Sequence, residues 1–230
     1  MIENGARCTM IGYGSWATAL MKVLLENEPR VGWYIADPEV REHIGERGNN
    51  PRYLSELHFD TSKIDLYGDI DEAVAAADIV ILCVPSAFLQ TILAKLTVPL
   101  NDKFVVSAIK GIIPGDYLTI AEFVNRCYGV PFDRVGIIGG PSHSEEVAME
   151  RLSYLTMVCK DITNARVLCD KFATPFIRTN PSTDIYCTEY AAVLKNNYAQ
   201  GVGIASDLGY GDNFLDVRVS NPATEKGRVL

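Results

Sequence analysis

The sequence predicts a doubly wound α/β fold, in which helices cover both faces of a largely parallel β-sheet. Short apolar runs recur along the chain, and near-continuous runs of this kind are typical of parallel strands buried on both faces. The segments between the runs are long enough to form crossover helices. At 230 residues the chain exceeds the usual single-domain length of about 100 to 200 residues, so we expect one complete domain and part of a second.

Eight segments are predicted to be strands of a single sheet. The first six lie at residues 7–11, 31–36, 63–67, 78–84, 103–109 and 134–139, with helical patterns between most of them. Two later strand-like runs, at residues 152–159 and 176–179, flank a helical pattern over residues 161–174. We assign these two runs to the same sheet.

The segment NPSTD, at residues 180–184, marks the predicted domain boundary. It is rich in turn residues and in residues that begin helices, and a long helical pattern follows it. We therefore expect a first domain over residues 1–183 and the start of a helical second domain over residues 184–230. Only about 45 residues follow the boundary, which is too few to bury a core of their own.

Composition and charge argue against several classes of protein. The formal net charge is -8 and the Lys and Arg residues form no run, so nucleic acid is not an expected partner. No stretch of about 18 apolar residues predicts a membrane span, and the N-terminus shows no secretory signal. The six cysteines form no CxxC pair and predict neither a metal site nor a redox motif. Reduced thiols indicate a cytoplasmic protein.

A glycine-rich turn follows the first predicted strand and opens a helix. Residues 10–20 read MIGYGSWATAL and match the pattern G-x-G-x-x-A through Gly12, Gly14 and Ala17. Gly12 permits the tight turn, Gly14 lets the backbone approach a pyrophosphate, and Ala17 lets the helix pack close to the strand. The helix N-terminus offers N–H groups and a partial positive charge to phosphates. The pattern predicts a dinucleotide-binding, Rossmann-type domain, although an isolated match can also be a turn without a ligand.

Asp37 follows the second predicted strand, about 25 residues after Gly12. An acidic side chain here can accept a hydrogen bond from the ribose 2′-OH of NAD. No Arg or Lys is expected nearby to bind the 2′-phosphate of NADP, so NAD is the preferred cofactor and NADP is possible. Alternatively, Asp37 is only a turn former before Pro38.

Three further segments follow later strands, on the side where an open α/β sheet binds ligands. They read CVPSAFL at residues 83–89, SAIKGIIPG at 107–115 and IGGPSHSEEVA at 138–148. Lys110 would place a cation at the cofactor and substrate site, although alone it could be a solvated loop lysine. Ser142 is the predicted N-cap of a helix, with Glu145 three residues later completing a capping box.

Together these stretches resemble the soluble NAD(P)-dependent sn-glycerol-3-phosphate dehydrogenases. The shared motifs are GYGSWATAL, VPS, KG, GPSHSEE, LKN and DLGYGDN, in the family's order and approximate spacing over most of residues 7–214. The resemblance implies hydride transfer with NAD(P) that interconverts sn-glycerol 3-phosphate and dihydroxyacetone phosphate, for glycerophospholipid synthesis. It also implies an all-helical second domain, a phosphorylated small-molecule substrate and a possible homodimer.

The resemblance assigns roles to individual residues. Lys195, in the motif LKN, matches the lysine that takes the proton from the substrate's 2-hydroxyl, and Asn196 would orient the substrate oxygen. The implied catalytic residues are Lys195, Lys110 and Asn196. The cofactor-binding residues that the resemblance implies are Ser15, Trp16, Tyr53, Lys110 and Ser144. They join Gly12, Gly14, Ala17 and Asp37, which are predicted from the dinucleotide-binding pattern. The implied substrate-binding residues are Lys110, Gly140, Ser142 and Lys195.

The sequence departs from the family's pattern at several points. Ser144 stands where alanine is common, and Ala36 stands where NADP-using members often carry a basic or imidazole side chain, which favours NAD. The family's aspartate near the catalytic lysine and its phosphate-binding arginine are absent, and the stretch after residue 214 does not continue as an apolar helix. Either the protein is a shortened, divergent relative, or the sequence is part of a longer one.

Three interpretations of the function follow. The chain is an active glycerol-3-phosphate dehydrogenase, completed by a second subunit. Alternatively, it is a dinucleotide-binding protein with impaired catalysis, because it lacks the arginine that binds the substrate phosphate. The third interpretation is a different hydroxy-acid dehydrogenase that needs no such arginine. We expect the chain to bind NAD(H) and to turn over dihydroxyacetone phosphate poorly.

Overall fold

The computed structural model describes residues 1–3 and 5–209, without the side chains of residues 195–199 and 202. Its strands are β1 (Cys8–Ile11), β2 (Val31–Tyr34), β3 (Ile64–Tyr67), β4 (Ile79–Leu82), β5 (Phe104–Ser107), β6 (Val135–Gly139), β7 (Ser153–Cys159) and β8 (Ile177–Ser182). Its α-helices are α1 (Ser15–Asn27), α2 (Pro38–Arg47), α3 (Ile70–Ala75), α4 (Ser86–Leu93), α5 (Ile120–Tyr128), α6 (Ser144–Ala148), α7 (Ile162–Phe172) and α8 (Ile185–Asp207).

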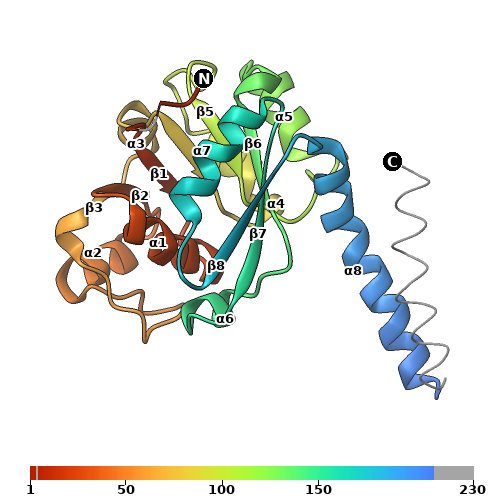
Figure 1. The fold of residues 1–230 in the computed structure, drawn as a ribbon. Helices are drawn as coiled ribbons and strands as arrows, with labels where there is room; N and C mark the ends of the chain where they lie inside the picture. The colour runs from red at the N-terminus through yellow and green to blue at the C-terminus, as the bar shows by residue number, and fades with distance from the viewer. Residues whose placement is uncertain (4, 210–230) are drawn as a thin grey trace.

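The strands of the described chain form one sheet in the order β3-β2-β1-β4-β5-β6-β7-β8 (Figure 1). Neighbouring strands are parallel, apart from the antiparallel pair β6 and β7. The chain starts at β1, runs to one edge through β2 and β3, and then returns to the other side of β1 at β4. This reversal creates a switch point at the carboxyl ends of β1 and β4, where open α/β sheets bind ligands. The predicted doubly wound α/β class is confirmed.

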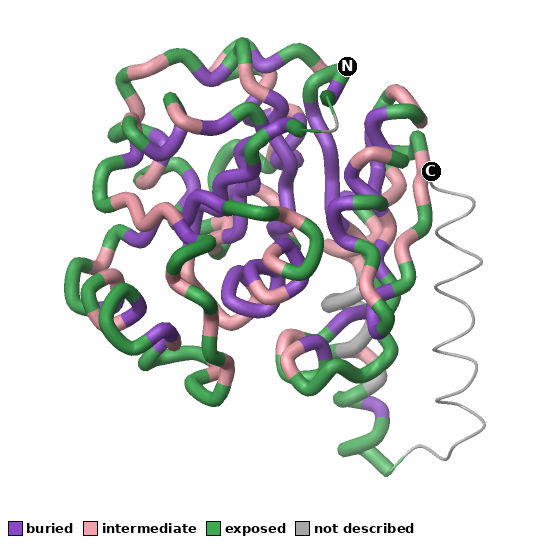
Figure 2. The backbone as a smooth tube through the Cα atoms, turned by 60° about the vertical axis from the view of Figure 1, so that its left-hand side comes forward, coloured by how far each residue is buried: buried purple, intermediate pink, exposed green. Residues whose placement is uncertain are grey.

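Helices bury both faces of this sheet. Met10 and Ile81 belong to a core shared with α1, α2, α6 and α7, whereas Ile11 and Leu82 belong to a core shared with α3, α4 and α5. Adjacent residues of one strand therefore point into different cores, which explains why the strands read as continuous apolar runs. Figure 2 shows the buried residues gathered inside the domain, with exposed residues over much of its surface.

The last strand differs from its prediction. β8 joins the sheet as expected, but it continues to Ser182, through part of the segment predicted to be a turn. Pro181 lies within it and has no N–H group to donate. Because β8 stands at the end of the strand order and pairs with β7, it is an edge strand, where proline is tolerated. α8 begins three residues after Ser182, capped by Asp184 Oδ1, which accepts from the N–H of Cys187 at 3.0 Å.

Several cysteines serve as core residues. Burial raises the pKa of Cys8 and of Cys159 to about 12, so both thiols stay neutral and pack as small apolar groups. In the described residues, His, Cys, Asp and Glu form no group of three or more that could hold a metal ion. None of the helices in that part of the chain has both the length and the apolar composition needed to cross a membrane.

A buried ion pair ties the N-terminal segment and α1 to α7. Lys171 is 4% exposed, and its Nζ donates to Glu28 Oε1 at 2.8 Å and to the carbonyl oxygen of Ala6 at 3.0 Å. Asn27 Nδ2 donates to the carbonyl oxygen of Lys171 at 3.0 Å beside it. Charged groups withdrawn from water in this way are stable only while they remain paired.

We expect Lys171→Met to lower the free energy of unfolding by about 3 kcal/mol, because the Glu28 carboxylate would lose its buried cation. Lys22→Met is the matched control, since Lys22 pairs with Glu150, whose side chain is 56% exposed. That change should cost less than about 1 kcal/mol. Urea unfolding of the two variants measures the difference, and equal losses would contradict the structural role of Lys171.

Candidate functional site

The turn between β1 and α1 forms the centre of the site. Gly12 has a φ of 119°, and a Cβ at this position would lie 2.2 Å from the carbonyl oxygen of Cys83, just after β4. The turn therefore requires glycine at position 12. Trp33 Nε1 donates to the carbonyl oxygen of Gly12 at 2.7 Å and fixes the turn from the core side.

The N-terminus of α1 is open to a ligand. Gly14 is its N-cap, and a Cβ placed there would meet nothing within 4 Å. The first turn of α1 contains no acidic residue. The N–H groups of Ser15, Trp16 and Ala17 have no acceptor within the helix and carry its partial positive charge. This arrangement suits a pyrophosphate.

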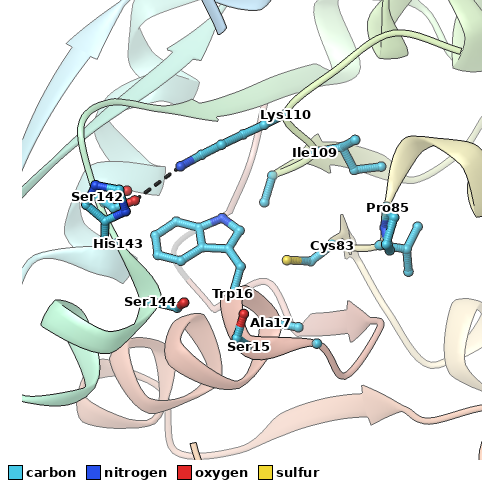
Figure 3. A pocket seen from close by; sticks show the side chains of 13 residues that line it. Ser15, Trp16, Ala17, Cys83, Pro85, Ile109, Lys110, Ser142, His143 and Ser144 are labelled. Atoms are coloured by element: carbon cyan, nitrogen blue, oxygen red, sulfur yellow. Dashed lines mark hydrogen bonds between the residues drawn. The ribbon is translucent and has the colours of Figure 1, made fainter. Parts of the chain in front are cut away.

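A first cavity of about 310 Å³ lies beside this helix end, next to the carboxyl ends of β1, β4 and β5 (Figure 3). Its walls include Ser15, Trp16, Ala17, Lys110, Ser142 and Ser144. Lys110 extends over the indole ring of Trp16, with Nζ 5.2 Å from the ring centroid, and donates to the carbonyl oxygen of Ser142 at 3.1 Å. The cation–π contact and the hydrogen bond hold the ammonium group at the cavity.

Two buried polar atoms at this cavity make no hydrogen bond within the described part of the chain. They are Trp16 Nε1 and Ser142 Oγ, and Ser142 is only 5% exposed. A buried polar atom without a partner costs about 1 to 3 kcal/mol. Both atoms therefore fit a ligand that supplies polar groups.

The predicted capping role of Ser142 is wrong. α6 begins at Ser144, and its N-cap is His143, which makes no side-chain capping bond. Because the helix starts later than predicted, the hydroxyl of Ser142 is left for the cavity. Ser144 Oγ instead donates to Glu145 Oε2 at 3.0 Å.

A second cavity, also of about 310 Å³, lies on the other side of the glycine-rich turn. It is lined mainly by apolar and aromatic side chains, among them Tyr34, Ala36, Tyr53 and Phe88. The two cavities share the residues Gly14, Cys83, Val84 and Pro85. A long ligand with an apolar ring at one end and polar groups at the other matches this pair of cavities.

Cys83 lies between the two cavities but is a poor nucleophile. Burial raises the pKa of its thiol, and the positive charge of Lys110 only partly opposes this rise. A neutral thiol is not the reactive form of cysteine. Cys83 therefore acts as a wall of the site.

Asp37 lies at the N-terminus of α2, and its Oδ1 accepts from the N–H groups of Glu39 and Val40 at 3.0 and 3.2 Å. Its Oδ2 lies 2.8 Å from Arg52 Nη2. The expectation that no Arg or Lys stands near Asp37 is therefore wrong. The loop after α2 folds back onto the glycine-rich turn, because the buried side chain of Asn50 donates to the carbonyl oxygen of Tyr13 at 2.8 Å.

The remaining predicted residues are only partly brought together. Tyr53 lines the second cavity, with its ring 6.4 Å from that of Tyr13. Gly140 is not among the cavity walls, and a Cβ there would lie 2.5 Å from the carbonyl oxygen of Tyr154. Lys195 and Asn196 belong to α8, but their side chains lie outside the described residues.

The doubly wound sheet, the open helix end and the paired cavities define a dinucleotide-binding α/β domain. A family model described as the N-terminus of NAD-dependent glycerol-3-phosphate dehydrogenase matches residues 7–165. The chain therefore belongs to the NAD-dependent glycerol-3-phosphate dehydrogenase family, and the resemblance seen in its motifs is confirmed.

Relatives with known names agree with this assignment. Glycerol-3-phosphate dehydrogenase [NAD(P)+] of Latilactobacillus sakei is 34% identical over 227 residues, which cover 96% of this chain and 66% of the relative. The enzyme of the same name from Streptococcus sanguinis is 32% identical over 229 residues, which cover 97% of this chain and 66% of the relative. The chain thus spans just under two thirds of the length of these relatives.

Solved structures of lower identity show the same fold. Glycerol-3-phosphate dehydrogenase of Plasmodium falciparum has a TM-score of 0.88 at 22% identity, covering 96% of this chain and 64% of that one. DsGPDH of Dunaliella salina has a TM-score of 0.86 at 24% identity, covering 97% of this chain and 41% of that one.

Substitutions at the two motif glycines should separate binding from folding. Gly14 has a φ of -67°, which suits any residue, so Gly14→Ala should cost less than about 1 kcal/mol of stability. Its Cβ would occupy the space before α1 and weaken NADH binding about tenfold or more. Gly12→Ala should instead cost more than about 2 kcal/mol, because of the strained φ and the contact with Cys83.

Fluorescence titration with NADH and urea unfolding measure the two effects in each variant. Wild-type affinity in Gly14→Ala would contradict the placement of the pyrophosphate at this helix end.

Glu189 joins α8 to the N-terminus of α5. The residue is 6% exposed, and its Oε1 accepts from the N–H of Ala121 at 3.1 Å. Burial raises the pKa of Glu189, while hydrogen bonds from Thr119 and from the backbone of α5 partly oppose the rise. When the pKa of a carboxyl group is higher in the folded protein than in the unfolded chain, its neutral form stabilises the fold at low pH. This stability is lost as the pH rises through the pKa of the folded state.

We therefore expect Glu189→Gln, which stays neutral, to gain stability relative to the wild type as the pH is raised from about 4, near the ordinary pKa of glutamate, toward neutrality. Thermal unfolding across this range measures the difference. Glu46→Gln, at an exposed position on α2, is the control and should follow the wild type. A constant difference between Glu189→Gln and the wild type would contradict a raised pKa at Glu189.

Proposed function

We propose that the chain contains the cofactor-binding part of an NAD(P)-dependent enzyme that interconverts sn-glycerol 3-phosphate and dihydroxyacetone phosphate. The main observation in support is the ammonium group of Lys110, held between the ring of Trp16 and the carbonyl of Ser142 at a cavity with unsatisfied polar atoms. The names of the relatives support the same reaction.

The described residues fit a dinucleotide. The open space before Gly14 and the N–H groups of α1 would receive the pyrophosphate. The apolar second cavity, with Tyr34 and Tyr53, would hold the adenosine end. The first cavity, with Lys110, would hold the nicotinamide end beside the substrate.

Hydride transfer to or from C2 of the substrate is the chemistry that the nicotinamide ring supplies. The oxygen on C2 changes its charge as its proton leaves or returns. The cation of Lys110 would stabilise negative charge on this oxygen, and the buried walls formed by Ala108 and Ile109 would strengthen the interaction by excluding water. Lys195 would exchange the proton with the oxygen, and Asn196 would orient it.

The wider proposal follows the family. The division into residues 1–183 and 184–230 is supported by the end of β8 at Ser182 and the start of α8 at Ile185. The resemblance supports a homodimer and a role in glycerophospholipid synthesis, and the cysteine pattern supports a cytoplasmic location. NAD(P) is the cofactor that the names of the relatives contain.

Oxidation of NADH in the presence of dihydroxyacetone phosphate tests the proposal. We expect turnover that falls about 100-fold or more in Lys195→Ala and in Lys110→Met, because one removes the proton carrier and the other the stabilising cation. Lys95→Met, at an exposed position after α4, is the matched control and should retain wild-type turnover.

The alternatives make different predictions for the same protein. NADH binding without turnover of dihydroxyacetone phosphate would favour the catalytically impaired binding protein. Turnover of non-phosphorylated 2-hydroxy acids, or of the matching 2-keto acids in reduction, would favour the third interpretation. Turnover that does not depend on Lys110 and Lys195 would contradict their proposed roles.

A further inference from the structure

The ion pair between Asp37 and Arg52 lies at the edge of the second cavity. Ala36, directly before Asp37, and Tyr53, directly after Arg52, both line that cavity. The pair therefore stands after the second strand of a dinucleotide-binding sheet, where the ribose of the adenosine half is recognised. Burial raises the pKa of Tyr13 in the glycine-rich turn, Asp37 adds to this rise and Arg52 opposes it, so both charges act on that turn.

The backbone on both sides of the ion pair is held firmly. Asp37 caps α2 through its Oδ1. The N–H of Arg52 donates to Asn50 Oδ1 at 3.0 Å. Asn50 is fully buried, and its Nδ2 donates to the carbonyl oxygen of Tyr13 and to Thr18 Oγ1 at 2.8 and 2.9 Å. The position of the pair is thus tied to the elements that meet the cofactor.

The side chain of Arg52 remains able to change its partner. It is 49% exposed, Asp37 is 19% exposed, and a second carboxylate oxygen, Glu39 Oε2, lies 3.9 Å from Arg52 Nη2 at a side chain that is 89% exposed. Ion pairs with a partner open to solvent contribute little to stability. A guanidinium group can bind a phosphate through two parallel hydrogen bonds. This contact is at least as strong as a partly solvated ion pair between the guanidinium group and a carboxylate. A phosphate at the edge of the second cavity would therefore compete successfully with Asp37 for Arg52.

Another arginine near the end of β2 is less suited to this role. Arg41 Nη1 donates to the carbonyl oxygen of Ile35 at 2.9 Å. Its guanidinium group lies so close to Gly68 that a Cβ there would be 2.6 Å from it. Arg41 is therefore engaged with the backbone of two neighbouring segments, whereas Arg52 is half exposed at the cavity edge.

We propose that Arg52 is a specificity-determining residue that admits NADP(H) to the site, while Asp37 serves NAD(H) in the same position. With NADH, Asp37 accepts a hydrogen bond from the ribose 2′-OH and keeps its pair with Arg52. With NADPH, Asp37 repels the 2′-phosphate, and Arg52 leaves Asp37 to bind it. The inference rests on the proposed dinucleotide function and deepens it by naming the residues of this chain that distinguish the two cofactors.

Binding titrations of the 230-residue chain with NADH and with NADPH test this inference. In Arg52→Gln we expect the Kd for NADPH to rise about tenfold or more, because a charged hydrogen-bond partner is lost. The Kd for NADH should change less than about twofold, because Asp37 and the hydrogen bonds that hold it at the N-terminus of α2 are retained. The NADPH affinity of the wild type should also fall more steeply with salt than that of Arg52→Gln.

Asp37→Asn tests the other half of the pair. Asparagine caps a helix as well as aspartate does, so α2 should be preserved. Removal of the carboxylate charge should strengthen NADPH binding about three- to tenfold and should not strengthen NADH binding. Arg126→Gln, an exposed arginine 3.9 Å from Glu122 on α5, is the control and should leave both affinities unchanged.

The outcomes separate this inference from the function on which it rests. A selective loss of NADPH binding in Arg52→Gln supports it. Equal losses of NADH and NADPH, or no loss of either, would overturn it and leave the dinucleotide site intact. Failure of the wild type to bind either dinucleotide would overturn the proposed function together with this inference.

Discussion

The close approach of Gly12 to the end of β4 controls the geometry of the whole site. A side chain at this position would meet the carbonyl oxygen of Cys83 at 2.2 Å. The backbone must therefore turn sharply, with a positive φ, at the point where the strand order reverses. That turn opens α1 toward the crevice, and it separates the first cavity from the second while leaving them joined through shared residues. The hydrogen bond from Trp33 anchors the same turn to the core, so core packing and ligand geometry depend on each other.

The cations of the site are held differently at its two cavities. At the first cavity, Lys110 contacts an indole face and a backbone carbonyl. At the second cavity the arrangement is different, because Arg52 meets Asp37 directly. An acidic protein with a net charge of -8 repels anions at long range, so it must attract them locally. The end of α1 and these two cations are the groups that would supply that local attraction.

The sheet was predictable from sequence because its strands are buried on both faces and its first turn has a strict glycine requirement. Both constraints act over a few adjacent residues. Side chains that reach the site from separate loops were harder to predict. The pairing of Arg52 with Asp37 depends on a loop anchored by Asn50, and a buried asparagine leaves no periodic signal in a sequence. The local capping pattern predicts Ser142 as a helix cap, but tertiary packing begins the helix later. The segment around Pro181 predicts a turn when it is read locally. Only the order of the strands in the sheet shows that β8 is an edge strand, where proline is tolerated.

The placement of α8 links the sheet to the predicted chemistry. Its first turns pack beside β6, where the methyl group of Thr188 would lie 2.6 Å from a Cβ at Gly139. The carboxyl group of Glu189 accepts from the N-terminus of α5, which provides a partial positive charge to a buried acid. Both contacts fix the start of the helix on the sheet. The backbone of position 195 lies fewer than two turns after Glu189 on the same helix, since one turn contains about 3.6 residues. The proton transfer proposed for Lys195 would therefore depend on how firmly this short segment is docked, and removal of the Glu189 carboxyl group would act on it through the position of the helix.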